Sequence, residues 1–136
     1  MENREYAFEF IKEYKDEWAK LAKEFEKLLF EDLDAALVKA RKLTELIVED
    51  IFELEQMENL EFANFSKRLW MLKSSGVLED DEFQLFDRIR RLGNLAAHAN
   101  QEIPFADGLK VHKNLYLILK WFMESYGSYD FQVPEY

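Results

Sequence analysis

The first 75 residues of this chain contain no glycine and no proline. All four glycines stand at position 76 or later, and the two prolines are Pro104 and Pro134. Glycine and proline interrupt a helix more strongly than any other residues, at about 1 and about 3 kcal/mol relative to alanine. A segment of this length without either of them is typical of long helices. The sequence therefore predicts a fold that is helical over most of its first half.

Apolar residues recur along the chain at the spacing of amphipathic helices. Over residues 8–28 they return every three, four or seven positions, which predicts one helix, or two short ones that meet near Lys15–Asp16. Asp32 is a suitable N-cap for a second helix, Asn64 for a third, and Gly76 can end the third in a left-handed conformation. The further expected elements are helices over about 32–56, 64–76, 81–99 and 105–126, a loop over 101–104 and an extended tail over 128–136.

No alternating run of strand length competes with these helices, and the chain contains no internal repeat. The pattern predicts an all-α, antiparallel helical bundle of four to five helices. We expect a single domain over residues 1–127, followed by a C-terminal tail or linker over 128–136. The side chains expected to face the core are Phe8, Ile11, Trp18, Leu21, Phe25, Leu28, Leu37, Ala40, Leu43, Leu46, Ile47, Ile51, Leu54, Leu69, Trp70 and Leu72.

Composition excludes several classes of protein. The chain has no cysteine, so it has no disulfides, thiolate nucleophile or zinc–thiolate site, and we expect it in the reducing cytoplasm. No apolar run approaches the about 20 residues that span a bilayer, and the N-terminal residues show no signal-peptide pattern. We therefore expect no membrane partner.

Known cofactor and metal signatures are also missing. The glycines are isolated from one another, so no phosphate-binding loop is present, and the only two histidines, His98 and His112, do not form a zinc-binding pair. We expect no cofactor and no metal. His112 is expected on the surface of the fifth helix.

The formal net charge of −10 argues against general nucleic-acid binding, because phosphate affinity depends on clustered lysine and arginine. The charge is unevenly distributed, however. Residues 1–62 hold 18 acids and 9 bases, whereas residues 63–120 hold 7 acids and 9 bases. The second segment offers either a local basic face that binds RNA or DNA or an ordinary solvated mixture of charges. The residues of this candidate basic face are Lys67, Arg68, Lys73, Arg88, Arg90, Arg91, Lys110 and Lys113.

Four polar residues of the fourth expected helix lie on one side of it. Asp87, Arg91, Asn94 and His98 are spaced by four, three and four positions, so they form a stripe about 16 Å long. This stripe is the one part of the sequence that combines residue types suited to chemistry.

The stripe belongs to a longer pattern that resembles a known family. Residues 90–98 read Arg-x-x-Gly-Asn-x-Ala-Ala-His, after Asp-Ala-Ala-Leu-Val-Lys-Ala-Arg at 34–41 and before Lys-Trp-Phe-Met-Glu-Ser-Tyr-Gly at 120–127. This arrangement resembles the helical domain of unknown function found at the N terminus of type I restriction enzyme R subunits, which is grouped with the HEPN superfamily. The resemblance implies an accessory domain of a restriction or phage-defence system, a homodimer, and other restriction subunits or a fused helicase–nuclease as partners.

Ribonucleases of that superfamily carry an arginine followed, after four to six residues, by a histidine. Arg91 and His98 have six residues between them, but Leu92 stands directly after the arginine, where active members favour a polar residue. A histidine near neutral pH can transfer protons, an arginine can stabilise charge on phosphorus, and Asn94 can orient either the histidine or a 2′-hydroxyl. The candidate catalytic residues of a dimeric, metal-independent endoribonuclease are therefore Arg91, Asn94 and His98.

The same residues also fit a purely architectural role. Arg91 can pair with Asp87 one turn earlier, His98 can stabilise the last turn of the helix, and Asn94 can hydrogen-bond a neighbouring helix. Gly93 would permit close helix contact. Three functions therefore stay open: an accessory domain that contacts nucleic acid or a subunit, an endoribonuclease, and a non-catalytic dimerisation scaffold.

Overall fold

The computed structural model describes residues 6–58, 63–98 and 102–136. These residues contain no strand, which confirms the predicted all-α fold. They form a short 3-10 helix and five α-helices, and none of these helices is long and apolar enough to cross a membrane. The elements are η1 (Glu9–Glu13), α1 (Asp16–Glu31), α2 (Leu33–Leu54), α3 (Phe65–Ser74), α4 (Asp80–His98) and α5 (Phe105–Tyr126).

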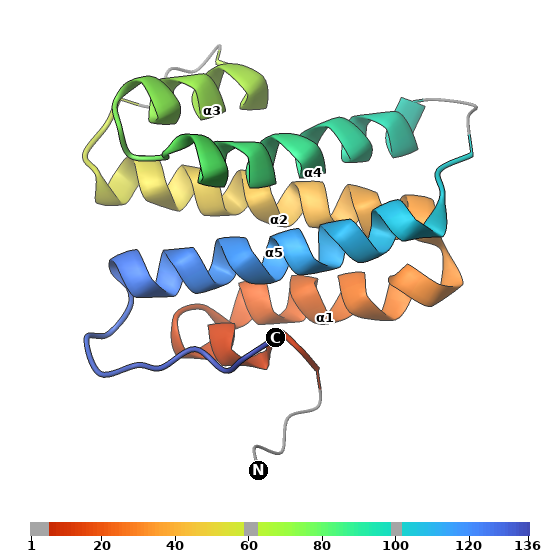
Figure 1. Cartoon of the computed structure of the whole chain (residues 1–136). Coiled ribbons are helices and arrows are strands. Elements are labelled where there is room, and N and C mark those ends of the chain that lie inside the picture. Colours follow the sequence, from red (N-terminus) through yellow and green to blue (C-terminus); the bar gives the residue numbers. More distant parts are fainter. Residues whose placement is uncertain (1–5, 59–62, 99–101) are drawn as a thin grey trace.

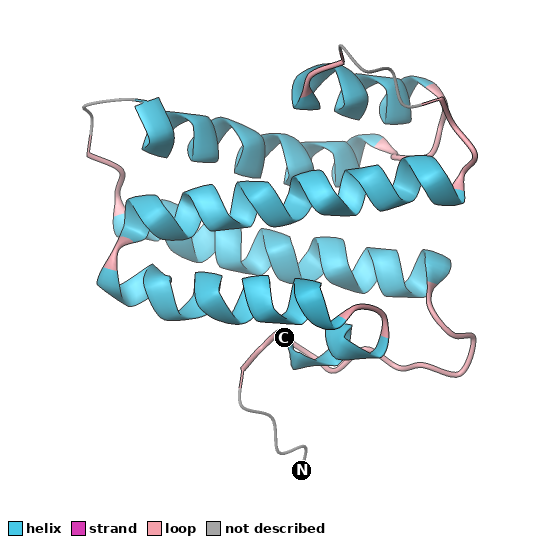
Figure 2. Ribbon diagram, turned by 180° about the vertical axis from the view of Figure 1, so that it is seen from behind, coloured by secondary structure: helices cyan, strands magenta, loops and turns pink. Residues whose placement is uncertain are grey.

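Four long helices form the bundle, and each runs antiparallel to the next along the chain (Figure 1). α2 packs against α1 on one side and α4 on the other, and α5 closes the bundle against α4 and α2. The short α3 lies outside this bundle, over α4, and the view from behind shows the same arrangement (Figure 2). α3 is held partly by Lys73, whose Nζ lies 4.7 Å from the centroid of the Phe83 ring and 3.2 Å from Asp80 Oδ1.

The helix ends follow the local signals of the sequence. The first helical stretch divides at Lys15, which is extended between η1 and α1. Asp32 Oδ1 accepts a hydrogen bond from Ala35 N at 3.2 Å, and Asn64 Oδ1 accepts one from Lys67 N at 2.8 Å. These contacts confirm the two predicted N-caps, because each satisfies a donor that the first helical turn leaves free.

Two other helix ends lie at or close to their predicted positions. Gly76 has the predicted left-handed conformation after α3, with φ of 83°. α2 ends two residues before the predicted position, because Gln56 has φ of 55° and the Met57 N–H bonds back to Phe52 O at 2.8 Å. The predicted end of the fourth helix at Ala99–Asn100 lies outside the described residues.

The core is built mainly from the predicted apolar positions, with two corrections. Leu54 is exposed because it is the last residue of α2, beyond the helices that cover its neighbours. Trp70 is 59% exposed, because α3 has one covered face and Leu69 and Leu72 occupy it. Leu21, Leu28 and Leu46 are only half-buried.

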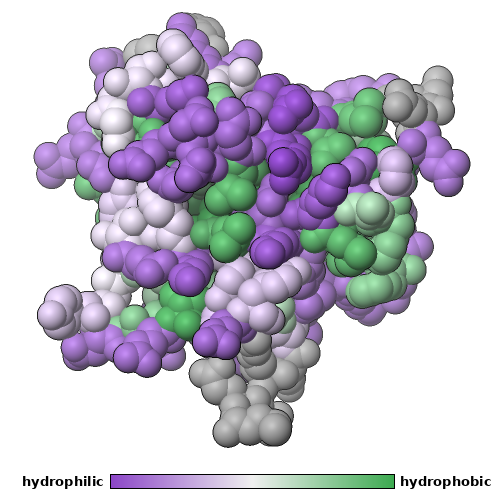
Figure 3. Space-filling model, in the orientation of Figure 1, coloured by the Kyte–Doolittle hydropathy of each residue, from purple (hydrophilic) through white to green (hydrophobic). Residues whose placement is uncertain are grey.

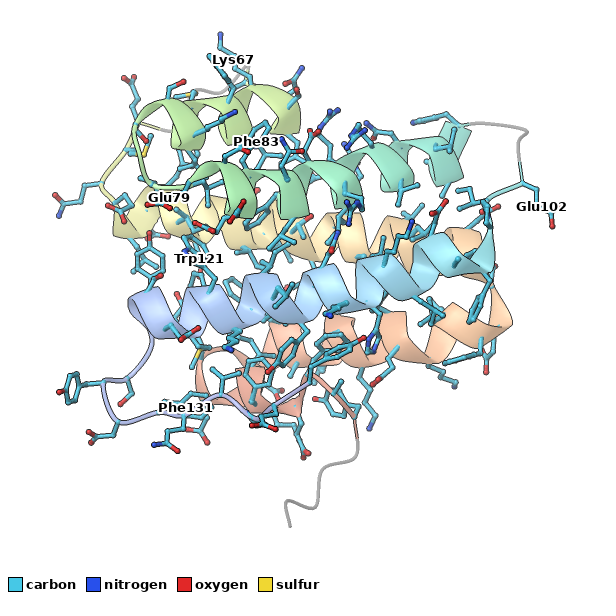
Figure 4. The ribbon with its side chains drawn as sticks, viewed as in Figure 1. Lys67, Glu79, Phe83, Glu102, Trp121 and Phe131 are labelled. Atoms are coloured by element: carbon cyan, nitrogen blue, oxygen red, sulfur yellow. The ribbon has the colours of Figure 1, made fainter. Side chains whose placement is uncertain are left out.

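The C-terminal residues 128–136, here called the tail, follow α5 without a helix, turn at Tyr129–Asp130 and pack against the bundle. Phe131 contacts Phe10 with ring centroids 6.5 Å apart, and the Tyr116 hydroxyl donates to the carbonyl of Pro134. Figure 4 shows Phe131 on the tail as it passes beneath the bundle. The tail therefore covers the face that η1 and α5 present.

Candidate nucleic-acid interface

The predicted polar stripe lies on α4 and is organised by Asp87. This carboxylate binds Arg90 through Oδ1, at 2.9 Å from Nε and 2.8 Å from Nη2, and it binds Arg91 Nε through Oδ2 at 3.0 Å. The Arg91 side chain is nevertheless 60% exposed. Asp87 therefore holds the Nε atom of the Arg91 guanidinium group, and the two Nη atoms of that group can bind other partners.

The far end of the stripe is open. Arg91, Asn94, Leu95 and His98 line a shallow depression on the surface of α4. Within the described part of the chain, neither Asn94 nor His98 has a side-chain hydrogen bond to another group. The structure therefore gives no support to the expected tether from Asn94 to a neighbouring helix, and it leaves His98 accessible to a ligand.

A second depression joins the stripe to α5. It has a volume of about 360 Å³ and is lined by Arg88, Arg91, Leu92, Leu95, Asp107 and Lys110. We call it the basic pocket. Arg88 also links the two helices, because its Nη1 donates to Asn114 Oδ1 at 3.4 Å. Two guanidinium groups, one ammonium group and one carboxylate thus surround an apolar floor, and the carboxylate, Asp107 Oδ1, lies 3.9 Å from Lys110 Nζ.

The structure divides the candidate basic face into two groups. Arg88, Arg90, Arg91, Lys110 and Lys113 lie on α4 and α5, where Lys113 is exposed about one turn after Lys110. Lys67, Arg68 and Lys73 lie on α3 instead, and Figure 4 shows Lys67 at its outer side. Lys73 is already paired with Asp80, and the buried Arg68 Nε has no hydrogen-bond partner within the described residues.

Gly93 has an architectural role that the sequence indicated only in outline. A Cβ atom at this position would lie 2.6 Å from Arg41 Cβ and 2.8 Å from Arg41 Cδ, so only glycine allows α4 to approach α2 this closely. The segments 34–41 and 90–98, which carry the family resemblance, therefore pack against each other. The Gly93 contact fixes which face of α4 points outward.

The sequence of this chain matches a family model. The model describes a domain of unknown function, DUF4145, and it matches residues 23–132, which is most of the chain. The chain belongs to the DUF4145 family. No curated protein and no solved structure matches it. The match to this DUF4145 domain runs from α1 into the tail, so it includes the stripe, the basic pocket and the Gly93–Arg41 contact.

Sequence reasoning missed one polar cluster of this DUF4145 domain. The prediction that His112 lies on the surface is wrong, since its side chain is only 14% exposed. Its Nε2 lies 3.0 Å from Glu26 Oε1 and its Nδ1 2.6 Å from the Tyr136 hydroxyl, while the Phe8 and Phe25 rings cover its sides. Burial, together with the charge of Glu26, raises the pKa of Tyr136.

This His112 cluster joins α1, α5 and the tail, which are far apart in the sequence. No local motif marks it, so only the tertiary structure could reveal it. Within the described residues, no group of three or more histidine or carboxylate side chains could hold a metal ion. The His112 contacts consume both ring nitrogens, whereas the His98 nitrogens stay accessible.

Proposed function

We propose that this DUF4145 domain is a HEPN-like accessory domain of a cytoplasmic restriction or phage-defence system, and that it contacts nucleic acid through the basic pocket. The basic pocket is the single observation that carries the proposal. Arg88 and Arg91 from α4 and Lys110 from α5 surround an open depression of about 360 Å³. The family resemblance supplies the setting, in which the domain helps to position or regulate a neighbouring nuclease, helicase or other subunit.

The lining of the pocket fits a nucleotide. Guanidinium groups bind phosphate oxygens in bidentate geometry, and phosphate contacts supply most of the affinity of non-specific nucleic-acid binding. Leu92 and Leu95 offer apolar surface on which a sugar or base edge can lie. The acidic remainder of the chain would repel nucleic acid, so binding is confined to this face.

Fluorescence anisotropy with labelled single-stranded RNA and DNA tests this proposal. Replacing Arg91 and Lys110 together by glutamate should weaken binding by about tenfold or more and reduce its salt dependence. Lys67→Glu, an exposed charge reversal on α3, is the matched control and should have a small effect. Equal affinities for wild type and the double variant would contradict the proposal.

A second candidate is metal-independent RNA cleavage by Arg91 and His98. The observation that favours it is that both side chains are exposed around one depression with Asn94 between them. Incubation of the protein with RNA in the presence of EDTA measures this activity directly. Loss of cleavage in His98→Ala, with RNA binding retained, would support catalysis, whereas equal cleavage by this variant would contradict it.

Both candidates are expected to act as a homodimer, because the family resemblance implies one and the α4 depression of a single chain is too shallow to enclose a substrate. A dimer that pairs the two α4 surfaces would also serve as a scaffold for other subunits. Light scattering should give the mass of two chains at tens of micromolar protein. A monomeric mass under these conditions would contradict this part of the proposal.

A further inference from the structure

Another exposed depression lies at the end of the bundle where α1 turns into α2 and α5 begins. It has a volume of about 410 Å³ and lies outside the basic pocket. We call it the acidic-rimmed groove, and it is lined by Leu29, Phe30, Glu31, Asp32, Leu33, Asp34, Glu102, Ile103 and Phe105.

The apolar part of this groove is unusually exposed for side chains of this size. Phe30 is 73% exposed and Phe105 is 44% exposed, although their ring centroids lie only 5.5 Å apart. Leu109, one turn further along α5, is also exposed. Figure 3 shows hydrophobic surface at this end of the molecule, where α5 begins. Grouped apolar side chains rimmed by polar ones typically mark an interaction site.

The groove has a closely packed floor. A Cβ atom on Gly108 would lie 2.6 Å from Leu33 Cδ1 and 2.9 Å from Leu29 Cδ1, so the first turn of α5 packs tightly onto both leucines. This close packing joins the first turn of α5 to the end of α1 and the start of α2, the segments that carry Phe105 and Phe30.

The rim of the groove is entirely acidic. Its charged side chains are Glu31, Asp32, Asp34 and Glu102, and none of them forms an ion pair within the described residues. Asp32 and Asp34 stabilise the start of α2 as cap and dipole partners. Glu31 has no such role, because it is the last residue of α1, where a negative charge is unfavourable. Figure 4 shows Glu102 pointing away from the bundle.

We propose that the acidic-rimmed groove binds a basic amphipathic segment of a partner protein. Apolar side chains of that segment pack against Phe30 and Phe105, and its lysines or arginines pair with Glu31 and Glu102. Charge complementarity selects this occupant. Nucleic acid and anionic lipid are repelled by the rim, and two copies of the groove facing each other would bring eight carboxylates together.

Anisotropy of two labelled amphipathic peptides tests this proposal, one made of leucine and lysine and the other of leucine and glutamate with the same apolar face. Wild type should bind the lysine peptide, more weakly at high salt, and should not bind the glutamate peptide. Phe30→Ala and Glu31→Lys should each weaken binding of the lysine peptide by about tenfold. Because both side chains are exposed, neither change should lower the melting temperature.

Two control variants separate the groove from the general acidity of the chain. Trp70→Ala removes an exposed aromatic ring from α3, and Glu124→Lys reverses an exposed charge at the far end of α5. Neither should weaken peptide binding. Equal losses in the controls and the groove variants, equal binding of both peptides, or no binding of the lysine peptide would each overturn the proposal. Self-association that Phe30→Ala abolishes would assign the groove to a second copy and would also overturn it.

Discussion

The two histidines of this domain lie in opposite surroundings. His98 ends α4 beside Arg91 and Asn94, on an open surface, and its ring has no partner within the described residues. His112 lies on α5 between two phenylalanine rings, and both of its nitrogens are bonded, to Glu26 and to Tyr136.

This difference separates a residue that is available to a ligand from one that holds the fold together. The sequence left open whether His98 binds a ligand or stabilises the last turn of its helix, and it placed His112 at the surface. The structure shows that His112 connects α1 to the tail instead. A histidine that is nearly buried and fully bonded has little capacity left for binding, whereas an exposed one contributes little to stability.

The largest effect should come from the aromatic support of the His112 cluster. Phe25 is fully buried beneath the His112 ring, so Phe25→Ala should cost about 3–5 kcal/mol through lost burial and the cavity left behind. Trp70→Ala, on the exposed side of α3, should cost under about 0.5 kcal/mol. Urea unfolding measures both values. Similar losses of stability in the two variants would contradict the distinction between the packed His112 cluster and the exposed surface.

The two histidines should also differ in stability, with His112 contributing more to the free energy of unfolding than His98. His112→Ala removes the partner of Glu26 Oε1 and of the Tyr136 hydroxyl, at an expected cost of about 1–3 kcal/mol. His98→Ala should change the free energy of unfolding by less than about 0.5 kcal/mol. His112→Gln, which keeps a polar side chain, is expected to lie between them. A larger loss for His98→Ala than for His112→Ala would reverse the account.

Alkaline pH should weaken the packed region through Tyr14. Burial, and the hydrogen bond that its hydroxyl donates to Asp50 Oδ2 at 2.9 Å, raise the pKa of Tyr14 to about 12 from 10.0. The folded state therefore holds this proton more tightly, so the stabilisation is complete below pH 10 and is lost as pH rises toward 12. Tyr14→Phe should be less stable than wild type at neutral pH, and the difference should shrink over that interval. A constant difference in urea titrations from pH 8 to 12 would contradict this.

Most of the fold could be predicted from local signals in the sequence. Asp32, Asn64 and Gly76 each act at a helix end through their own backbone neighbourhood, which is why sequence alone located them. The errors at Leu54 and Trp70 have another cause. Periodicity shows that a helix has an apolar face, but it does not show where the covering helix stops.

Only part of the candidate site could be predicted from the sequence. The stripe on α4 lies within one helix, so its spacing placed Asp87, Arg91, Asn94 and His98 on one side. The basic pocket needs Lys110 from α5, and the His112 cluster needs α1 and the tail, so both depend on how helices pack. Separation of Lys67 and Arg68 from the other bases follows from the position of α3 outside the bundle.

The smallest effect should be a gain in stability. The Asn94 side chain has no hydrogen bond within the described residues, and asparagine has a poorer helix propensity than alanine. Asn94→Ala should therefore raise the free energy of unfolding by about 0.5 kcal/mol. Differential scanning calorimetry would register this as a small rise in melting temperature. A fall would show that the amide does tie α4 to another helix.

Amide chemical shifts recorded during a titration with RNA test most directly whether the α4 face is the one available to a ligand. Titration of the labelled domain with single-stranded RNA should shift amides over Arg88–His98 of α4 and around Asp107 and Lys110 of α5. The amides around Glu26, His112 and Tyr136 should stay unchanged. Shifts centred on the His112 cluster, or no shifts on α4, would contradict the account.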